Sequence, residues 1–204
     1  MKKVFGIDGI ATKILSKIAD LVVINILWVI CSLPIVTIGA STTAMFYVTL
    51  KMAKNEEAYI VSSFFRAFKE SFKQSTVVWI IMILVSFVLY TDLRFSTMEG
   101  VAGSDLFFAL FLVLTVVAML TSLYVFPVMA YFENSTKKVI KNSFLLAVSY
   151  VPYTLLILII SAIPWVFLVF GNIFVAGFLC CIILFSLAAW VNAHLYRKIF
   201  DKHR

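Results

Sequence analysis

Side chains that could do chemistry are few in this chain, and they lie far apart. The two histidines, His194 and His203, are both near the C-terminal end, and the three cysteines all fall inside apolar runs. Cys180 and Cys181 are adjacent, so their side chains would diverge around a helix and could not converge on a zinc ion. His194 lies just ahead of a basic cluster, as interfacial polar residues often do, and a substrate contact is its alternative role.

No motif for catalysis or cofactor binding accompanies these residues. The sequence has no HExxH pair, no spaced set of Cys and His, no phosphate-binding Gly loop and no nucleophile elbow. We therefore predict no catalytic, cofactor-binding or metal-binding residue, and we expect that the protein is not an enzyme. A lipid-modifying intramembrane enzyme is the remote alternative, and it would need two convergent acid or base groups.

Transport is the other chemistry that the polar residues could support. The centres of the apolar runs carry no charged side chain that would mark a coupling site. Five residues predict a broken first helix whose freed carbonyls could hold a cation: Pro34, Gly39, Ser41, Thr42 and Thr43. The small pair Gly39 and Thr43 equally suits close helix packing. A transporter would also need its polar residues to line one cavity: Asn25, Tyr47, Tyr90, Tyr124, Asn172 and Asn192.

The elements that must position these residues are membrane-spanning helices. Of 204 residues, 63% are hydrophobic and 13% are charged, which leaves too little polar surface for a soluble protein of this size. We predict a single all-α membrane domain over residues 1–204, a polytopic bundle of about six spans. The apolar runs cover residues 19–38, 76–91, 106–132, 149–170 and 173–195. The segment 40–53 either crosses as a short helix or re-enters, because Pro34 and Gly39 interrupt the run before it.

Positive charge sets the predicted topology. Of the 17 Lys and Arg residues, 16 fall in four segments that share one side of the membrane if the chain crosses six times, and Arg94 alone lies opposite. Because cytoplasmic loops are rich in Lys and Arg, we expect a multi-pass protein of the cell membrane with a cytoplasmic N-terminus and a cytoplasmic C-terminus. These cations flank apolar runs and form no contiguous basic face, so lipid headgroups and not nucleic acid are their expected partners.

Residues 57–75 predict a cytoplasmic amphipathic helix. Apolar side chains recur there at helical spacing, opposite a basic face that includes Arg66 and Lys69: Val61, Phe64, Phe65, Phe68 and Phe72. In one interpretation the helix lies in the headgroup layer with its aromatic rings toward the acyl chains. In the other, the aromatic stripe docks into a groove of a cytoplasmic partner.

A family resemblance rests on the same segments. The stretch Leu33-Pro-Ile-Val-Thr-Ile-Gly39, the run Ser41 to Ala44 and the run Phe64 to Lys69 resemble the YesL family of small bacterial membrane proteins. The likeness extends over residues 28–160, although Ala40 stands where that family usually has a Pro. The resemblance implies a membrane protein of unknown function that accompanies carbohydrate uptake systems. It implies a carbohydrate transporter or sensor subunit as a partner, and it supplies no catalytic residue.

Two main hypotheses follow from the sequence. The first is a non-enzymatic accessory component associated with bacterial carbohydrate uptake or sensing, in contact with membrane lipids and with a transporter or sensor subunit. The second is a small transporter that uses the broken first helix and could form a homo-oligomer. A polar cavity shared by the spans would favour the transporter, and scattered, separately bonded polar groups would favour the accessory component.

Overall fold

The computed structural model describes residues 10–56, 59–97 and 104–202, and every regular element among them is helical. This confirms the all-α prediction. Six stretches are long and apolar enough to cross a membrane. The elements are α2 (Ile10–Ser32), the 3₁₀ turn η1 (Ile35–Thr37), α3 (Ile38–Ala53), α4 (Ile60–Ser96), α5 (Ser104–Tyr131), α6 (Thr136–Ser149), α7 (Val151–Phe170), α8 (Ile173–Leu179), the π-helical turn η2 (Cys180–Leu184) and α9 (Phe185–Phe200).

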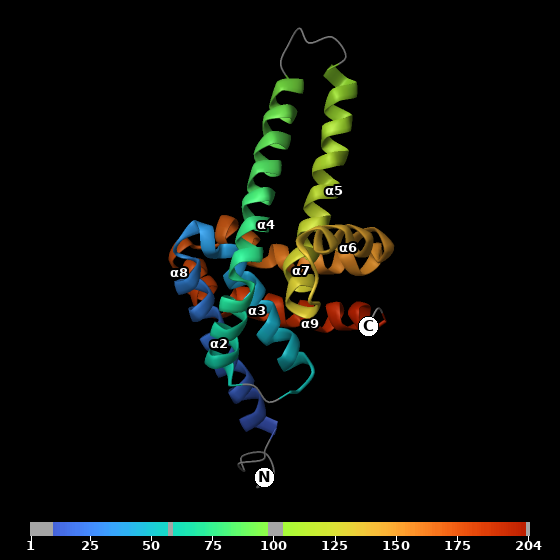
Figure 1. Ribbon diagram of the computed structural model, residues 1–204. Coiled ribbons are helices and arrows are strands. Elements are labelled where there is room, and N and C mark those ends of the chain that lie inside the picture. The colour runs from blue at the N-terminus through green and yellow to red at the C-terminus, as the bar shows by residue number, and fades with distance from the viewer. Residues whose placement is uncertain (1–9, 57–58, 98–103, 203–204) are drawn as a thin grey trace.

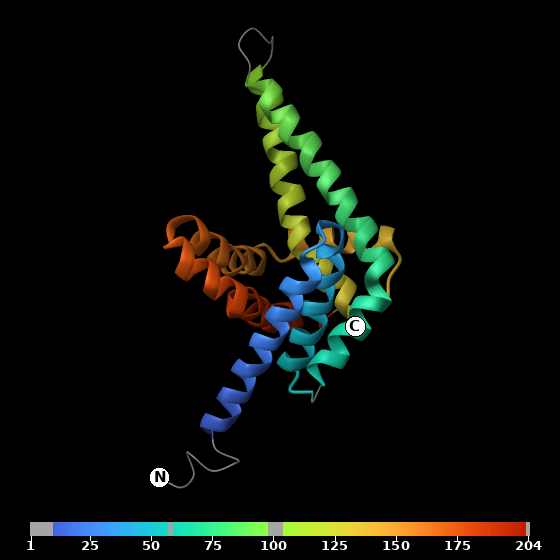
Figure 2. The same ribbon diagram turned by 90° about the vertical axis from the view of Figure 1, so that its left-hand side faces the viewer.

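The helices do not all run in one direction. In Figure 1, α4 and α5 rise together as a long hairpin beyond the rest of the molecule. Helices α2 and α3 pack beside the first half of α4, and α7 and α9 run across the base of the hairpin. Figure 2, turned by 90°, shows the same hairpin standing clear of the other helices. The larger core cluster joins α3, α4, α5, α6, α7 and α9, and a second cluster joins α2 to α3, α4 and α9.

The first apolar run, residues 19–38, does not form one helix. Helix α2 begins at Ile10, well before the run, and ends at Ser32, and a 3₁₀ turn precedes α3. Pro34 causes the break, because its ring blocks the helical hydrogen bond and it disfavours helical geometry at Leu33. The chain then continues as the short helix α3, Ile38–Ala53, which corresponds to the predicted segment 40–53.

Two further helices, α4 and α6, differ from what the sequence predicted. The predicted amphipathic helix 57–75 and the predicted span 76–91 are one helix of 37 residues, α4, because no Gly or Pro separates them. Residues 57–58 of that segment lie outside the described residues. A helix not foreseen from the sequence, α6, follows α5 and buries Val139, Ser143 and Leu146 while its Lys side chains face away. Because its apolar content is moderate, the segment resembles a basic loop in the sequence.

Helix α3 is the most enclosed of the candidate spans. In its window 61% of residues are buried, whereas the α5 window has none, and its mean hydropathy of 1.2 is the lowest of the six. Its buried positions are mostly small, including Gly39, Ala40, Ser41 and Ala44. A helix surrounded by protein needs no apolar surface for lipid, and small side chains let its neighbours approach closely. For this reason the sequence alone did not decide whether residues 40–53 cross the membrane or re-enter.

Candidate functional site around helix α3

The predicted broken helix lies at the first end of α3, and three carbonyls there have protein donors. The indole Nε1 of Trp79 donates to Ile35 O at 2.9 Å, and Thr37 Oγ1 donates to Cys31 O at 2.5 Å. Pro34 O accepts from the backbone N–H of Thr37 at 2.9 Å. Freed carbonyls in a membrane must find such donors. These three oxygens are therefore engaged within the protein.

The next turn of α3 packs tightly against α4. A Cβ placed on Gly39 would lie 2.7 Å from Ser75 O and 2.8 Å from Trp79 Cβ. One turn on, the hydroxyls of Thr43 and Ser75 are 2.9 Å apart, and Thr43 Oγ1 also donates to Gly39 O. Thr42 accepts a hydrogen bond from the indole of Trp28 at 3.1 Å. The small-residue motif thus forms a close helix crossing with polar bonds across it.

Ser41, the remaining residue of the motif, is fully buried. Within the described part of the chain its hydroxyl has no hydrogen-bond partner. The five predicted residues therefore lie together around one end of α3, with four of them making backbone or side-chain contacts to α2, η1 or α4. Together these residues form a close packing contact between α3 and the neighbouring helices.

The six polar residues that a transport cavity would need are bonded to six different partners. Two of them, Asn25 and Tyr124, are completely buried, whereas Tyr90 is largely exposed on the α4–α5 hairpin. The partners are Cys180 O for Asn25, Arg66 for Tyr47, Arg94 for Tyr90, Thr154 for Tyr124, the Phe174 N–H for Asn172 and Ser161 for Asn192. These residues are scattered through the fold, and of the six only Tyr47 lines either of the two hollows described below.

Asn25 holds the π-helical turn that divides the last span. Its amide donates to Cys180 O at 2.8 Å and to Cys181 O at 2.7 Å, and its carbonyl accepts from Ser186 N at 2.9 Å. Ser186 Oγ donates back to Leu21 O at 2.8 Å. A π-helical turn leaves backbone groups without their usual partners, and this side chain replaces them. Sequence reasoning missed the pairing, although an Asn inside an apolar run was a signal of a buried polar role.

The aromatic stripe of α4 divides between two faces. Phe64 is completely buried in a cluster with Val48 and Met52 of α3. Phe68 is half-buried and its ring stacks on that of Phe64, with centroids 6.4 Å apart. Val61, Phe65 and Phe72 are exposed. The prediction that all five form one contact face does not fit this geometry, because Phe64 faces α3.

The second end of α3 forms a basic and aromatic pocket of ≈ 190 Å³ beside the end of α5. Leu50, Ala130 and Phe132 form the apolar part of its lining. Five residues form the polar part: Tyr47, Lys51, Lys54, Glu56 and Tyr131. The Nζ of Lys51 lies 4.8 Å from the ring centre of Tyr47, and that of Lys54 lies 4.9 Å from the ring centre of Tyr131. Cations placed over aromatic faces are attracted to them.

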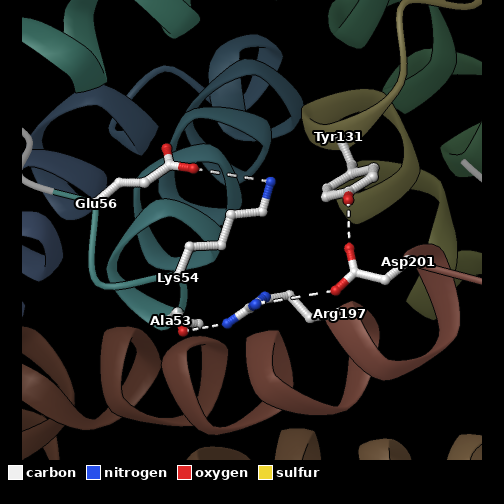
Figure 3. A network of polar contacts seen from close by, with 6 residues as sticks. All are labelled: Ala53, Lys54, Glu56, Tyr131, Arg197 and Asp201. Carbon is white, nitrogen blue, oxygen red and sulfur yellow. Dashed lines mark hydrogen bonds and ion pairs between the residues drawn. The ribbon is translucent and has the colours of Figure 1, made fainter.

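A network of polar contacts borders this pocket (Figure 3). Arg197 of α9 donates to Ala53 O at the end of α3 and lies 3.9 Å from Asp201 Oδ2. Tyr131 OH donates to the other oxygen of Asp201 at 2.6 Å. Lys54 pairs with Glu56 at 4.0 Å. The pairing of Lys54 with Tyr131 could not be read from the sequence, since the two residues lie far apart along the chain.

A second hollow lies between α7 and α9. It is an apolar groove of ≈ 390 Å³ lined by Leu156, Ile160, Trp190, Val191, His194 and Leu195. The Nδ1 of His194 lies 2.9 Å from Trp190 O, so the ring is tied to its own helix. Among the described residues no group of three His, Cys, Asp or Glu side chains could hold a metal ion.

Comparison with known proteins finds a family model and two relatives that the chain resembles. Residues 21–93 match the family described as "Protein of unknown function, DUF624". The uncharacterized protein YesL of Bacillus subtilis (strain 168) is 33% identical over 138 residues, covering 65% of this chain and 64% of YesL. The uncharacterized protein YteU of the same organism is 28% identical over 142 residues, covering 67% and 63%. The aligned region thus spans less than two thirds of each relative. No solved structure matches the chain.

Proposed function

Because the chain belongs to the YesL family of membrane proteins of unknown function, we propose that it is a non-enzymatic accessory component that binds another membrane protein. The family resemblance implies a carbohydrate uptake or sensing system as the setting, so a transporter permease or sensor subunit is the first partner to test. Both chain ends lie in the cytoplasm in this proposal, as the distribution of Lys and Arg favours.

The apolar stripe of α4, which is exposed except at the half-buried Phe68, is the observation that carries the proposal. Val61, Phe65, Phe68 and Phe72 recur at spacings of four, three and four residues, which places them on one side of the helix. Phe64, on the adjacent side, fixes the helix to α3 through full burial. The stripe is therefore carried by a helix that is packed against α3. A helix anchored in this way suits recognition in a hydrophobic groove.

The scattered polar groups support an accessory role over transport. Asn25 and Tyr124, which a transporter could use at a substrate site, instead satisfy a π-helical turn and the hydroxyl of Thr154. Two carbonyls at the helix break, Cys31 O and Ile35 O, have protein donors as well. These groups stabilise the fold, and each would have to break a hydrogen bond before it could contact a transported solute.

Purification from native membranes in mild detergent tests the proposal. The variant Phe65→Ser, Phe72→Ser removes exposed rings of the stripe, whereas Phe64 is left in place because its loss would disturb the core. Phe95→Ser, Phe107→Ser is the matched control, since both rings are exposed near the tip of the α4–α5 hairpin. We expect a permease or sensor subunit to co-purify with the wild type and the control and to be lost from the stripe variant.

Two results would contradict the proposal. Equal recovery of the partner with the stripe variant would show that the stripe is not the contact. A wild-type protein that purifies alone as a homo-oligomer would instead favour the transport hypothesis. Thermal unfolding of each variant in detergent separates loss of the partner from loss of the fold.

A further inference from the structure

We propose that the pocket at the second end of α3 binds a phosphate group, carried by an anionic lipid headgroup or by a small soluble phosphate. This site is separate from the α4 stripe and does not depend on the proposed accessory function. The pocket joins α3 to α5, with Tyr47, Lys51 and Lys54 on one side and Tyr131 on the other. A bound phosphate would therefore link the two helices.

The cations of the pocket exceed its acids. Lys51 and Lys54 line it, and Arg66 adjoins it through a 2.6 Å hydrogen bond from Nη2 to Tyr47 OH. Glu56 is the acid in the lining, and its carboxylate is 4.0 Å from Lys54 Nζ. Among the described residues, no acid lies within ion-pair distance of Lys51 or Arg66. The lining itself thus holds two lysines and one glutamate, and Asp201, which borders it, is held by Tyr131 and Arg197.

The end of α3 does not use these cations as its cap. Cations at a helix C-terminus can stabilise its free carbonyls, which is an alternative role for Lys51 and Lys54. The Lys51 and Met52 carbonyls accept from the backbone N–H groups of Glu56 and Asn55, with Asn55 in the left-handed region at φ 54°. Leu50 O accepts from Lys54 N, and Arg197 donates to Ala53 O. The last four carbonyls are satisfied, and the ammonium groups of Lys51 and Lys54 lie over tyrosine rings instead.

Hydrogen-bond donors for a phosphate oxygen are present as well. Tyr47 OH accepts from Arg66, so its own proton can be donated to a bound anion. Asp201 is held by Tyr131 and Arg197. Two ammonium groups and a phenol around a hollow of ≈ 190 Å³ form a donor set suited to phosphate oxygens, which favour charge-assisted hydrogen bonds.

The test uses the full-length protein and two phosphate probes. The thermal stability of the reconstituted protein, followed as the phosphatidylglycerol content of phosphatidylcholine nanodiscs is raised, reports a lipid source. The rise in thermal stability with inorganic phosphate in a neutral detergent reports a soluble source. The double variant Lys51→Gln, Lys54→Gln removes both lining cations, and Lys137→Gln, Lys138→Gln on α6 removes the same charge outside the pocket.

We expect the pocket variant to bind the effective probe at least about tenfold more weakly, and the α6 control to bind like the wild type. Glu56→Gln removes the acid of the lining and should tighten binding. Because this effect is opposite in sign, it tests the proposal even if the lysine variant folds poorly. A lipid-only response assigns a headgroup, and a response to inorganic phosphate assigns a soluble ligand. Equal binding by wild type and pocket variant, equal losses in pocket and control variants, or no gain with Glu56→Gln would overturn the proposal.

Discussion

Replacing Gly39 with alanine tests the close crossing of α3 and α4. The added Cβ would lie 2.7 Å from Ser75 O and 2.8 Å from Trp79 Cβ, where ordinary contact begins at 3.4 Å. The helices must therefore separate by about 0.7 Å, the difference between 3.4 Å and 2.7 Å. Such a separation would lengthen the 2.9 Å Thr43–Ser75 contact to about 3.6 Å, beyond the range of a hydrogen bond.

The free-energy cost follows from three terms. Overpacking a tight site costs about 1–3 kcal/mol. Loss of an interhelical hydrogen bond within a membrane protein costs about 0.6 kcal/mol. The higher helix propensity of alanine over glycine stabilises the folded state by about 0.8–1.0 kcal/mol, which offsets part of this cost. The net destabilisation is about 0.6–2.8 kcal/mol, which lowers Tm by roughly 1–11 °C for a protein of this size. Gly39→Leu adds a longer side chain at the same contact and should cost more.

Tryptophan fluorescence during thermal unfolding in detergent measures this effect. Gly177→Ala is the matched control, because a Cβ there meets no atom within 4 Å. Its Tm should be unchanged or slightly higher, since alanine stabilises an open helical position. If Gly39→Ala unfolded at the same temperature as Gly177→Ala, the helices could not be in the close contact described.

Three further predictions address the supports of the fold. Asn25→Leu leaves two carbonyls and one N–H of the π-helical region without their side-chain partner, so it should lower the free energy of unfolding by about 2–4 kcal/mol in the same thermal assay. Asn55→Val should cost about 1–2 kcal/mol because φ is 54° at this position, whereas Asn55→Gly should retain the Tm of the wild type. Spin labels at Ser62 and Ser86 in a background without native cysteines should lie about 36 Å apart along a continuous helix. A bend of 90° at residue 75 would shorten that distance to about 25 Å.

The spans were predictable because apolar length is a property of the chain itself. A run of about 20 apolar residues can be counted in the sequence, and the ring of Pro34 acts on its immediate neighbours. The break between α2 and α3 therefore follows from local chemistry. The end of α2 at Ser32 needed the structure, since a proline constrains a helix boundary only to within a few residues.

The partners of individual side chains were not predictable in this way. Phe64 and Phe65 are neighbours of the same type, and only the packing of α3 makes the first buried and the second exposed. Asn25 bonds to residues more than 150 positions away, at a π-helical turn that no local pattern announces. The basic pocket is similar, because Lys54 meets Tyr131 only after α5 returns to the end of α3. Long-range packing decides these contacts, and a single sequence contains no direct record of it.

The length of α4 constrains how α3 can sit in a bilayer. At 1.5 Å per residue, 37 residues extend about 55 Å, nearly twice the roughly 30 Å hydrocarbon core. Arg66, Lys69 and Lys73 place the first half of α4 at or beyond the headgroups, because charges are costly in the core. Gly39 contacts Ser75, and Phe64 packs in the cluster that includes Met52, so α3 runs beside that charged half. A continuous α4 therefore favours the re-entrant interpretation of α3, in which the α2–α3 pair enters and returns on one side. The enclosure and low hydropathy of α3 agree with that placement, since a helix shielded by protein has little need of lipid-facing apolar surface.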